Sequence, residues 1–175
     1  RYLAAFHLAG EHPEHEPMDA VYAMATYDGK DLNDMFVYPD VVTDWAVDLA
    51  ADLGVAGGRH VLLDWRAGIA AEVTDGFDIQ ELPHLYDFAY FVLAPVQDNG
   101  MALLGETAKY VTLADRRFTA TAVRADGFAL TLAGVPGEAV EVLAFDADAG
   151  ALVGPVEAII GADGAATVDL IRTGG

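Results

Sequence analysis

The chain has 175 residues, enough for one ordinary domain with a sizeable core. It contains no cysteine and no serine, which excludes disulfides, thiolate nucleophiles, zinc–cysteine sites and serine hydrolases. The 28 acidic residues outnumber the 9 basic ones and give a net charge of −19. This charge argues against nucleic acid and anionic membranes as partners, because both require a positive surface. No apolar run approaches the length of about 18 residues that a membrane span needs.

The acidic residues are dispersed along the chain. Aspartate outnumbers glutamate 19 to 9, and lysine occurs only at Lys30 and Lys109. In molar salt the Debye length falls to about 3 Å, which screens the self-repulsion of such a surface. The composition therefore predicts a halophilic protein in the cytoplasm of a salt-accumulating organism. The alternative is an acidic mesophilic domain that is merely soluble.

The first 33 residues differ in character from the rest. Residues 1–7 (RYLAAFH) predict a strand, the polar stretch GEHPEHEPMD predicts a loop, and residues 19–27 (DAVYAMATY) predict a second strand. No signal peptide is predicted, because no charged segment followed by a long apolar segment precedes the first strand. Since the chain begins at Arg1 and not at methionine, we expect it to be a fragment.

Two alternating segments come next. Residues 43–49 (TDWAVDL) alternate as a half-buried strand does, and we expect a short helical turn at 50–54 to follow. A helix over residues 44–53 is the competing interpretation. In HVLLDWRAG, Val61, Leu63 and Trp65 alternate with more polar neighbours and predict a second half-buried strand.

Residues 85–96 (LYDFAYFVLAPV) are apolar on both faces of a predicted strand. A strand of this kind is covered on both faces. We expect it to be either a central strand beneath an additional layer or the surface that meets another domain. The candidate interface consists of Tyr86, Phe88, Tyr90, Phe91 and Leu93.

The C-terminal half predicts a series of hairpins. Strands at residues 118–124, 128–133, 139–145, 152–160 and 166–171 are separated by the turns Ala125-Asp126-Gly127, Pro136-Gly137-Glu138 and Ala162-Asp163-Gly164. No long helical pattern lies between them. The predicted fold is therefore all-β, an antiparallel β-sandwich of Greek-key-like type.

The sequence contains only weak candidates for metal-binding or catalytic clusters. His12 and His15 are three apart with Pro13 between them, which does not fit a zinc site on a helix, and a solvated loop is favoured. Asp146 and Asp148 resemble the start of a calcium loop, but the later ligands are missing, so a hairpin turn is favoured. We therefore assign no catalytic, cofactor-binding or metal-binding residue.

Basic residues gather in one part of the chain. Four of the nine lie within 16 residues, at Lys109, Arg116, Arg117 and Arg124. In so acidic a chain we expect them to pair with carboxylates, within the domain or across an interface. A site for a phosphate or an anionic substrate is the alternative.

Several motifs resemble the C-terminal β-domain of multi-domain glycoside hydrolases, most closely the α-galactosidase and raffinose-synthase-like group. They are Asp64-Trp65-Arg66-Ala67-Gly68, Leu93-Ala94-Pro95, the apolar segment Gly100–Gly105 and Lys109-Tyr110. The resemblance covers roughly residues 36–172. It implies that residues 1–33 are the tail of a preceding catalytic region and that 34–173 form the C-terminal β-sandwich domain.

In that family the catalytic aspartates lie on a (β/α)₈ barrel that precedes the β-domain, and no position here matches them. The resemblance therefore implies a non-catalytic accessory domain of a glycoside hydrolase acting on α-galactosides or related sugars. Its partner would be the upstream barrel, which it caps and stabilises, and self-association into an oligomer stays open.

Two other functions remain open. The first is a carbohydrate-binding or cell-surface module that exposes Trp45, Trp65 or Tyr90 as platforms for sugar rings. The second is a small enzyme with two carboxylates about 5–10 Å apart, as in glycosidases.

Overall fold

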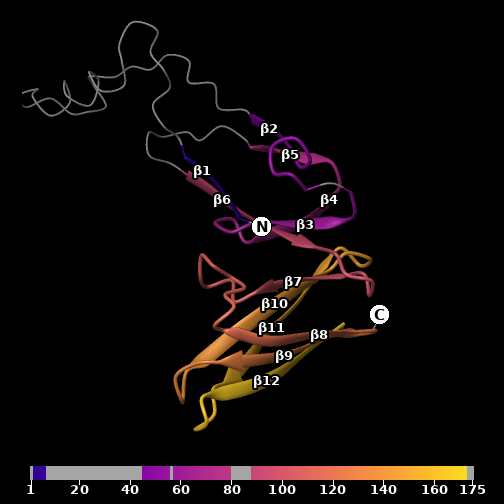
Figure 1. Cartoon of the computed structure of the whole chain (residues 1–175). Helices are drawn as coiled ribbons and strands as arrows, with labels where there is room; N and C mark the ends of the chain where they lie inside the picture. Colours follow the sequence, from indigo (N-terminus) through magenta and orange to yellow (C-terminus); the bar gives the residue numbers. More distant parts are fainter. Residues whose placement is uncertain (1, 7–44, 56, 80–87, 173–175) are drawn as a thin grey trace, which may run out of the picture. The chain divides into compact units, whose positions relative to one another are not determined.

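A computed structural model gives the arrangement of residues 2–6, 45–55, 57–79 and 88–172 (Figure 1). These residues form strands and turns, and none of them is helical. No helix able to cross a membrane is found in this part of the chain. The strands are β1 (Tyr2–Phe6), β2 (Trp45–Asp48), β3 (His60–Asp64), β4 (Ile69–Val73), β5 (Gly76–Ile79), β6 (Phe88–Pro95), β7 (Met101–Gly105), β8 (Phe118–Arg124), β9 (Gly127–Ala133), β10 (Ala139–Asp146), β11 (Ala151–Ile159) and β12 (Ala165–Ile171).

The chain divides into two compact units. The first comprises Arg1–Leu3, Asp48–Gly76 and Tyr90–Gly175, and the second comprises Ala4–Val47 and Phe77–Ala89. In the second unit, β2 and β5 form a two-stranded sheet. The expected domain boundary after residue 33, the loop with His12 and His15 and the predicted strand at 19–27 all lie outside the described residues.

Three sheets account for the other strands. Their strand orders are β1-β6-β3-β4, β11-β10-β7 and β12-β9-β8. In each sheet an inner strand runs antiparallel to the strands on both sides: β3 to β4 and β6, β10 to β7 and β11, and β9 to β8 and β12. The predicted all-β antiparallel architecture is confirmed, and the sheets of β10 and β9 form the sandwich.

The sheet of β10 lies between two hydrophobic cores of the first unit. The sandwich core separates it from the sheet of β9 and contains Met101, Leu103, Phe128, Leu130, Leu132, Val140, Val142, Ala144, Val153, Ala158, Ile160, Val168 and Leu170. The second core separates it from β3 and β6 and contains Val61, Leu63, Val92, Ala94, Ala102, Leu104 and Phe145. Successive side chains of a strand point to opposite faces. The alternating residues of β7 therefore enter the two cores in turn, and all five are buried.

The strand β6 is buried on both faces, as its apolar sequence predicts. Val92 and Ala94 lie in the second core. Phe91 and Leu93, which point to the opposite face, are only 7% and 4% exposed. The alternation at Val61 and Leu63 is likewise confirmed, because both side chains are buried in the same core.

The predicted series of C-terminal hairpins is correct in only two places. The pairs β8–β9 and β10–β11 are hairpins. The turn at Pro136-Gly137-Glu138 instead carries the chain from the sheet of β9 to that of β10, and the turn at Ala162-Asp163-Gly164 carries it back. The two crossovers lie side by side, since Gly134 donates a backbone hydrogen bond to Gly164 (3.0 Å). Alternation and turn residues predict where strands end but not which strands pair.

Two aspartates shape tight turns at strand ends. The carboxylate of Asp64 accepts hydrogen bonds from the amides of Arg66 and Ala67, both at 3.0 Å, in the β3–β4 turn. Asp146 does the same for Asp148 and Ala149 in the β10–β11 turn, at 3.0 and 3.1 Å. The suspected calcium loop is thus a hairpin turn, as the sequence favours.

The chain turns after β2, where the sequence predicts a short helical turn at residues 50–54. Asp52 and Gly54 donate backbone hydrogen bonds to the carbonyls four residues earlier, at 2.9 and 3.1 Å. The segment at 45–48 is a strand and the competing helix is wrong.

Candidate functional site

The loop between β7 and β8, residues 106–117, is held in a fixed shape by its own backbone. The amide of Glu106 donates to the carbonyl of Thr112 at 2.8 Å, and that of Arg117 donates to Ala114 at 2.8 Å. Gly105 opens the loop with φ = +82°, and a Cβ atom there would overlap the Thr112 carbonyl. We call residues 106–117 the β7–β8 loop.

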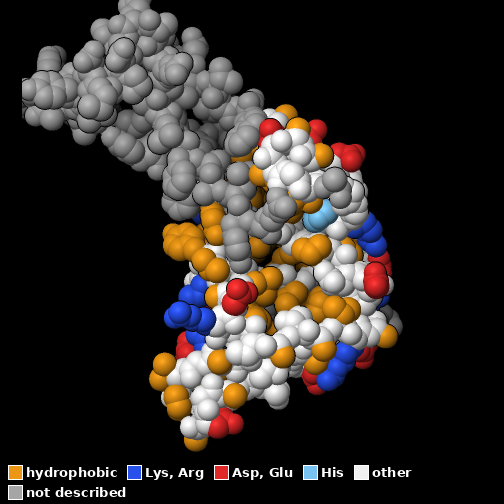
Figure 2. Space-filling model, in the orientation of Figure 1, with side chains coloured by type: hydrophobic (Ala, Val, Ile, Leu, Met, Phe, Trp, Pro, Cys, Tyr) orange, Lys and Arg blue, Asp and Glu red, His pale blue; other side chains and the backbone are white. Residues whose placement is uncertain are grey.

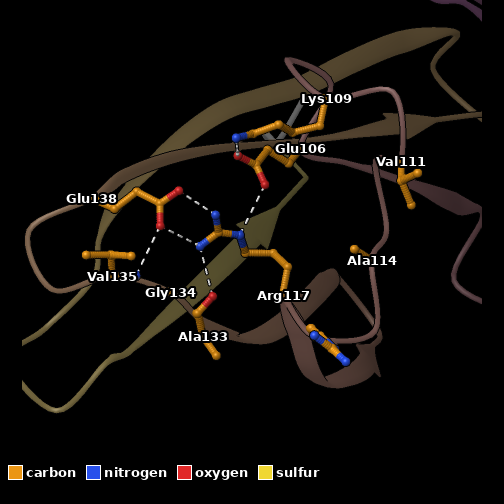
Figure 3. A pocket seen from close by; sticks show the side chains of 10 residues that line it. Glu106, Lys109, Val111, Ala114, Arg117, Ala133, Gly134, Val135 and Glu138 are labelled. Atoms are coloured by element: carbon orange, nitrogen blue, oxygen red, sulfur yellow. Dashed lines mark hydrogen bonds and ion pairs between the residues drawn. The ribbon is translucent and has the colours of Figure 1, made fainter.

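Arg117, at the end of this loop, binds two carboxylates (Figure 3). Its Nε donates to Glu106 at 3.2 Å, and its two terminal nitrogens donate to the two oxygens of Glu138. It also donates to the carbonyl of Ala133 at 2.8 Å. Gly134 leaves room for this arrangement, because a Cβ there would lie 2.6 Å from Glu138 Oε2 and would overlap the guanidinium.

The network is partly buried, and this strengthens it. The side chains of Arg117, Glu106 and Glu138 are 15%, 9% and 27% exposed. The hydrogen bonds from Arg117 hold the pKa of Glu138 below its ordinary value, with a smaller contribution from the Val135 amide. The same carboxylate raises the pKa of Arg117. Arg117 and Glu138 are therefore both charged at neutral pH.

An open pocket of about 530 Å³ lies beside this network. It combines three cations and two carboxylates with small and apolar side chains (Figure 3). The lining residues are Glu106, Lys109, Val111, Ala114, Arg116, Arg117, Ala133, Gly134, Val135 and Glu138. Its size is within the range of about 300–1,000 Å³ that is usual for ligand sites.

Three aromatic rings meet against the β7–β8 loop. The rings of Trp65 and Tyr110 are stacked, with centroids 4.5 Å apart and planes 27° apart. Tyr90 meets both rings edge to face, at 6.1 and 5.5 Å. Trp65 Nε1 donates to the carbonyl of Thr107 at 2.7 Å, and the Tyr90 hydroxyl donates to that of Tyr110 at 2.6 Å. We call Trp65, Tyr90 and Tyr110 the aromatic cluster.

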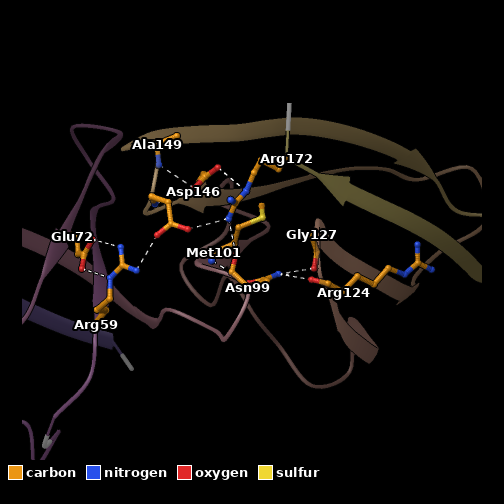
Figure 4. A network of polar contacts seen from close by, with 10 residues as sticks. Arg59, Glu72, Asn99, Met101, Arg124, Gly127, Asp146, Ala149 and Arg172 are labelled. Carbon is orange, nitrogen blue, oxygen red and sulfur yellow. Dashed lines mark hydrogen bonds and ion pairs between the residues drawn. The ribbon is translucent and has the colours of Figure 1, made fainter. Parts of the chain in front are cut away.

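A second polar network joins chain segments that are far apart in sequence (Figure 4). Arg59 binds both oxygens of Glu72, at 2.6 and 2.9 Å, and also binds Asp148 at 3.0 Å. Arg172 forms ion pairs with Asp146 at 2.9 Å and Asp148 at 3.5 Å. These contacts tie β4 and the segment before β3 to the β10–β11 turn and to the end of β12.

Asn99 adds a further link to this network. Its side-chain amide donates to the carbonyls of Arg124 and Gly127, both at 2.9 Å, while its oxygen accepts from the amide of Met101 at 3.0 Å. Its backbone carbonyl accepts from Arg172 at 2.6 Å. The turn before β7 is therefore fixed to the β8–β9 hairpin, and this network has a structural role.

The candidate interface residues that the structure describes do not form an exposed surface. Phe91 and Leu93 are buried in the chain, and Tyr90 is half-buried in the aromatic cluster. Tyr86 and the side chain of Phe88 lie outside the described residues, as does the side chain of Trp45.

The expected pairing of the clustered bases with carboxylates is confirmed for three of them. Lys109 lies 3.8 Å from Glu106, Arg117 binds Glu106 and Glu138, and Arg124 binds Asp169 at 3.0 Å. Arg116 is exposed in the pocket. Sequence reasoning did not anticipate that Tyr110 joins Trp65 and Tyr90. Trp65 and Tyr110 belong to the Asp64–Gly68 and Lys109-Tyr110 motifs, but neither motif indicates that the two rings meet.

Among the described residues, no group of three or more histidine, aspartate or glutamate side chains is placed to hold a metal ion. Comparison of the sequence with protein-family models and with curated proteins finds no match.

Proposed function

We propose that this chain is a non-catalytic accessory β-domain of a glycoside hydrolase of the α-galactosidase and raffinose-synthase-like group, and that it caps and stabilises a (β/α)₈ barrel. The observation that carries the proposal is the meeting of motif residues. Trp65, from the Asp64–Gly68 motif, stacks on Tyr110, from the Lys109-Tyr110 motif. Two motifs that are 45 residues apart in the chain therefore share a structural role, which is what motifs that identify a family of β-domains would do.

The non-catalytic role is supported by the state of the pocket carboxylates. A glycosidase needs one carboxyl group whose raised pKa keeps it protonated and a second that is free to attack or to activate water. Glu106 and Glu138 both bind the same guanidinium, and the pKa of Glu138 is lowered. This arrangement suits neither role, so the pair is structural.

The first test is an assay of the purified chain with 4-nitrophenyl α-galactoside and raffinose. We expect no turnover. Any turnover would refute the non-catalytic role. Turnover that persists in Glu106→Gln and Glu138→Gln variants would place the chemistry elsewhere in this chain, and turnover that they lose would show that this pair is catalytic.

The second test is the coding sequence that precedes Arg1. The proposal expects a (β/α)₈ barrel with catalytic aspartates there. A preceding region of another fold, or an initiating methionine directly before Arg1, would refute the role as the cap of a barrel.

A further inference from the structure

The strand β8 lies at the edge of the sheet β12-β9-β8, and among the described strands it pairs only with β9. All of its residues after Phe118 are exposed. Every second residue of an edge strand points its amide and carbonyl groups away from the sheet, and no described strand receives those of β8. β8 therefore presents an open edge that can accept a further strand.

This edge lacks the features that usually protect an open strand. Native proteins place charged side chains or prolines on such edges. The edge strand β11 contains Pro155 and Glu157, and the edge strand β12 contains Asp169. In β8 the segment FTATAV (118–123) contains neither, and its one irregularity is a register shift at its start. Figure 2 shows mostly uncharged surface over β8 and β9.

The face of β8 that continues the sandwich core is also uncovered. Val123 pairs with Phe128, which is buried in that core, so the two side chains lie on the same face of the sheet. Val123 is nevertheless 47% exposed, whereas Phe128 is 1% exposed. A strand added at the edge of β8 would shield this apolar side chain from water.

We propose that β8 pairs antiparallel with β8 of a second copy of this chain, about a two-fold axis at Thr121. In this register Arg116 of each copy comes opposite Asp126 of the other, because both lie five residues from Thr121. Both residues are exposed, and neither forms an ion pair with another described residue. Arg124 comes opposite Phe118, so no two like charges face each other.

The charge pattern selects a second copy as the partner. A two-fold axis makes every contact twice, so one cation and one anion that are both unpaired in the single chain form two ion pairs in the dimer. The axis itself brings together two threonines, which is a favourable cross-strand pair. A single strand pair is smaller than a standard interface of about 800 Å² per partner, so we expect a dimer that dissociates on dilution. The pairing does not depend on the proposed accessory role.

The first test is sedimentation velocity of the full chain over a range of concentrations. An ionic strength of about 0.15 M keeps the Debye length near 8 Å, so that close ion pairs still act. Val123→Lys places a charge on the edge and should weaken dimerisation about tenfold or more. The matched control is Ile159→Lys, which adds the same charge to an equally exposed residue of β11 and should leave dimerisation unchanged.

A charge exchange tests the register. Arg116→Asp brings two carboxylates together at each end of the pairing and should weaken dimerisation about fivefold, as should Asp126→Arg with two guanidinium groups. The double variant Arg116→Asp/Asp126→Arg restores opposite charges and should dimerise within about twofold of the wild type.

Cross-linking gives a measurement that a charged variant cannot disturb. The chain has no cysteine, so a single introduced cysteine reports one contact. Opposite Cα atoms of an antiparallel pair lie about 4.5–5.5 Å apart, within the range that a disulfide spans. Thr121→Cys should therefore form a covalent dimer on mild oxidation, whereas Ile159→Cys should stay monomeric. If Val123→Lys fails to fold, as judged by circular dichroism, this result decides.

Three outcomes would overturn the inference. The first is a monomer at every concentration up to about 1 mM, with no cross-link through Thr121→Cys. The second is a dimer that a folded Val123→Lys variant leaves unchanged, because another surface would then hold it together. The third is a double charge variant that dimerises no better than Arg116→Asp alone, because Arg116 and Asp126 would then not meet.

Discussion

Replacing Arg117 with methionine removes the cation between two carboxylates and keeps most of the side-chain volume. Glu106, whose side chain is 9% exposed, would then keep only Lys109 at 3.8 Å. Breaking a buried ion pair costs about 3–5 kcal/mol, because one charge is left uncompensated. Glu138 is more exposed, at 27%, and recovers part of its hydration. We therefore expect a cost at the lower end of this range. The free energy of unfolding should fall by about 3 kcal/mol and the melting temperature by roughly 6–12 °C.

Urea denaturation followed by circular dichroism measures this loss without adding salt. The matched control is Arg124→Met, because Arg124 and Asp169 pair at 3.0 Å with both side chains about half exposed. That pair should contribute less than about 1 kcal/mol. The double variant Arg117→Met/Glu106→Gln should be more stable than Arg117→Met alone, since it removes the unpaired charge. A double variant less stable than Arg117→Met would show that the argument from burial and charge is wrong.

Three other predictions concern charge and backbone. Melting temperature should rise between low and molar KCl as the −19 charge is screened, and a flat response would contradict the halophilic interpretation. The hydrogen bond from Arg59 lowers the pKa of Glu72 from its ordinary value of 4.5, so this pair stabilises the fold above that pH and the stabilisation is lost as the pH falls through the folded-state pKa. The stability difference between wild type and Glu72→Gln, measured in urea, should therefore persist from about pH 8 to 5 and vanish in stronger acid, whereas a difference independent of pH would exclude the ion pair as its cause. Gly105→Ala should cost more than Gly137→Ala, because both positions have φ above +80° but only at Gly105 would the new Cβ overlap a carbonyl oxygen; equal melting temperatures would count against that overlap.

Sequence reasoning predicts the strands well where apolar residues alternate. The alternation predicts that Val61 and Leu63 share one buried face, and the predicted strand limits near Phe118, Ala139 and Ile171 agree with the structure to within about a residue. The sequence does not predict β4, because the side chains of IAAEV are mostly small and exposed and show no apolar alternation. Pairing was also missed, since a crossover and a hairpin use the same turn residues.

For the candidate site, the sequence predicts which kinds of residue pair but not which residues meet. The bases near Arg117 were expected to pair with carboxylates, but their partners Glu106 and Glu138 are 32 residues apart, and only the packing of the sheets brings them together. Likewise, nothing in the local sequence of Tyr110 indicates that it contacts Trp65, 45 residues earlier. Contacts of this range depend on the strand order, which the sequence pattern did not determine.

The strand β7 has a consequence for how the first unit opens. Met101 and Leu103 belong to the sandwich core, while Ala102 and Leu104 belong to the second core. Detaching this strand would expose both cores to water at once, so local opening there costs nearly as much as global unfolding. Amide protons of β7 should therefore be among the slowest of the chain to exchange with deuterium. The two cores then unfold together, and a destabilising substitution in either core lowers the stability of the whole first unit.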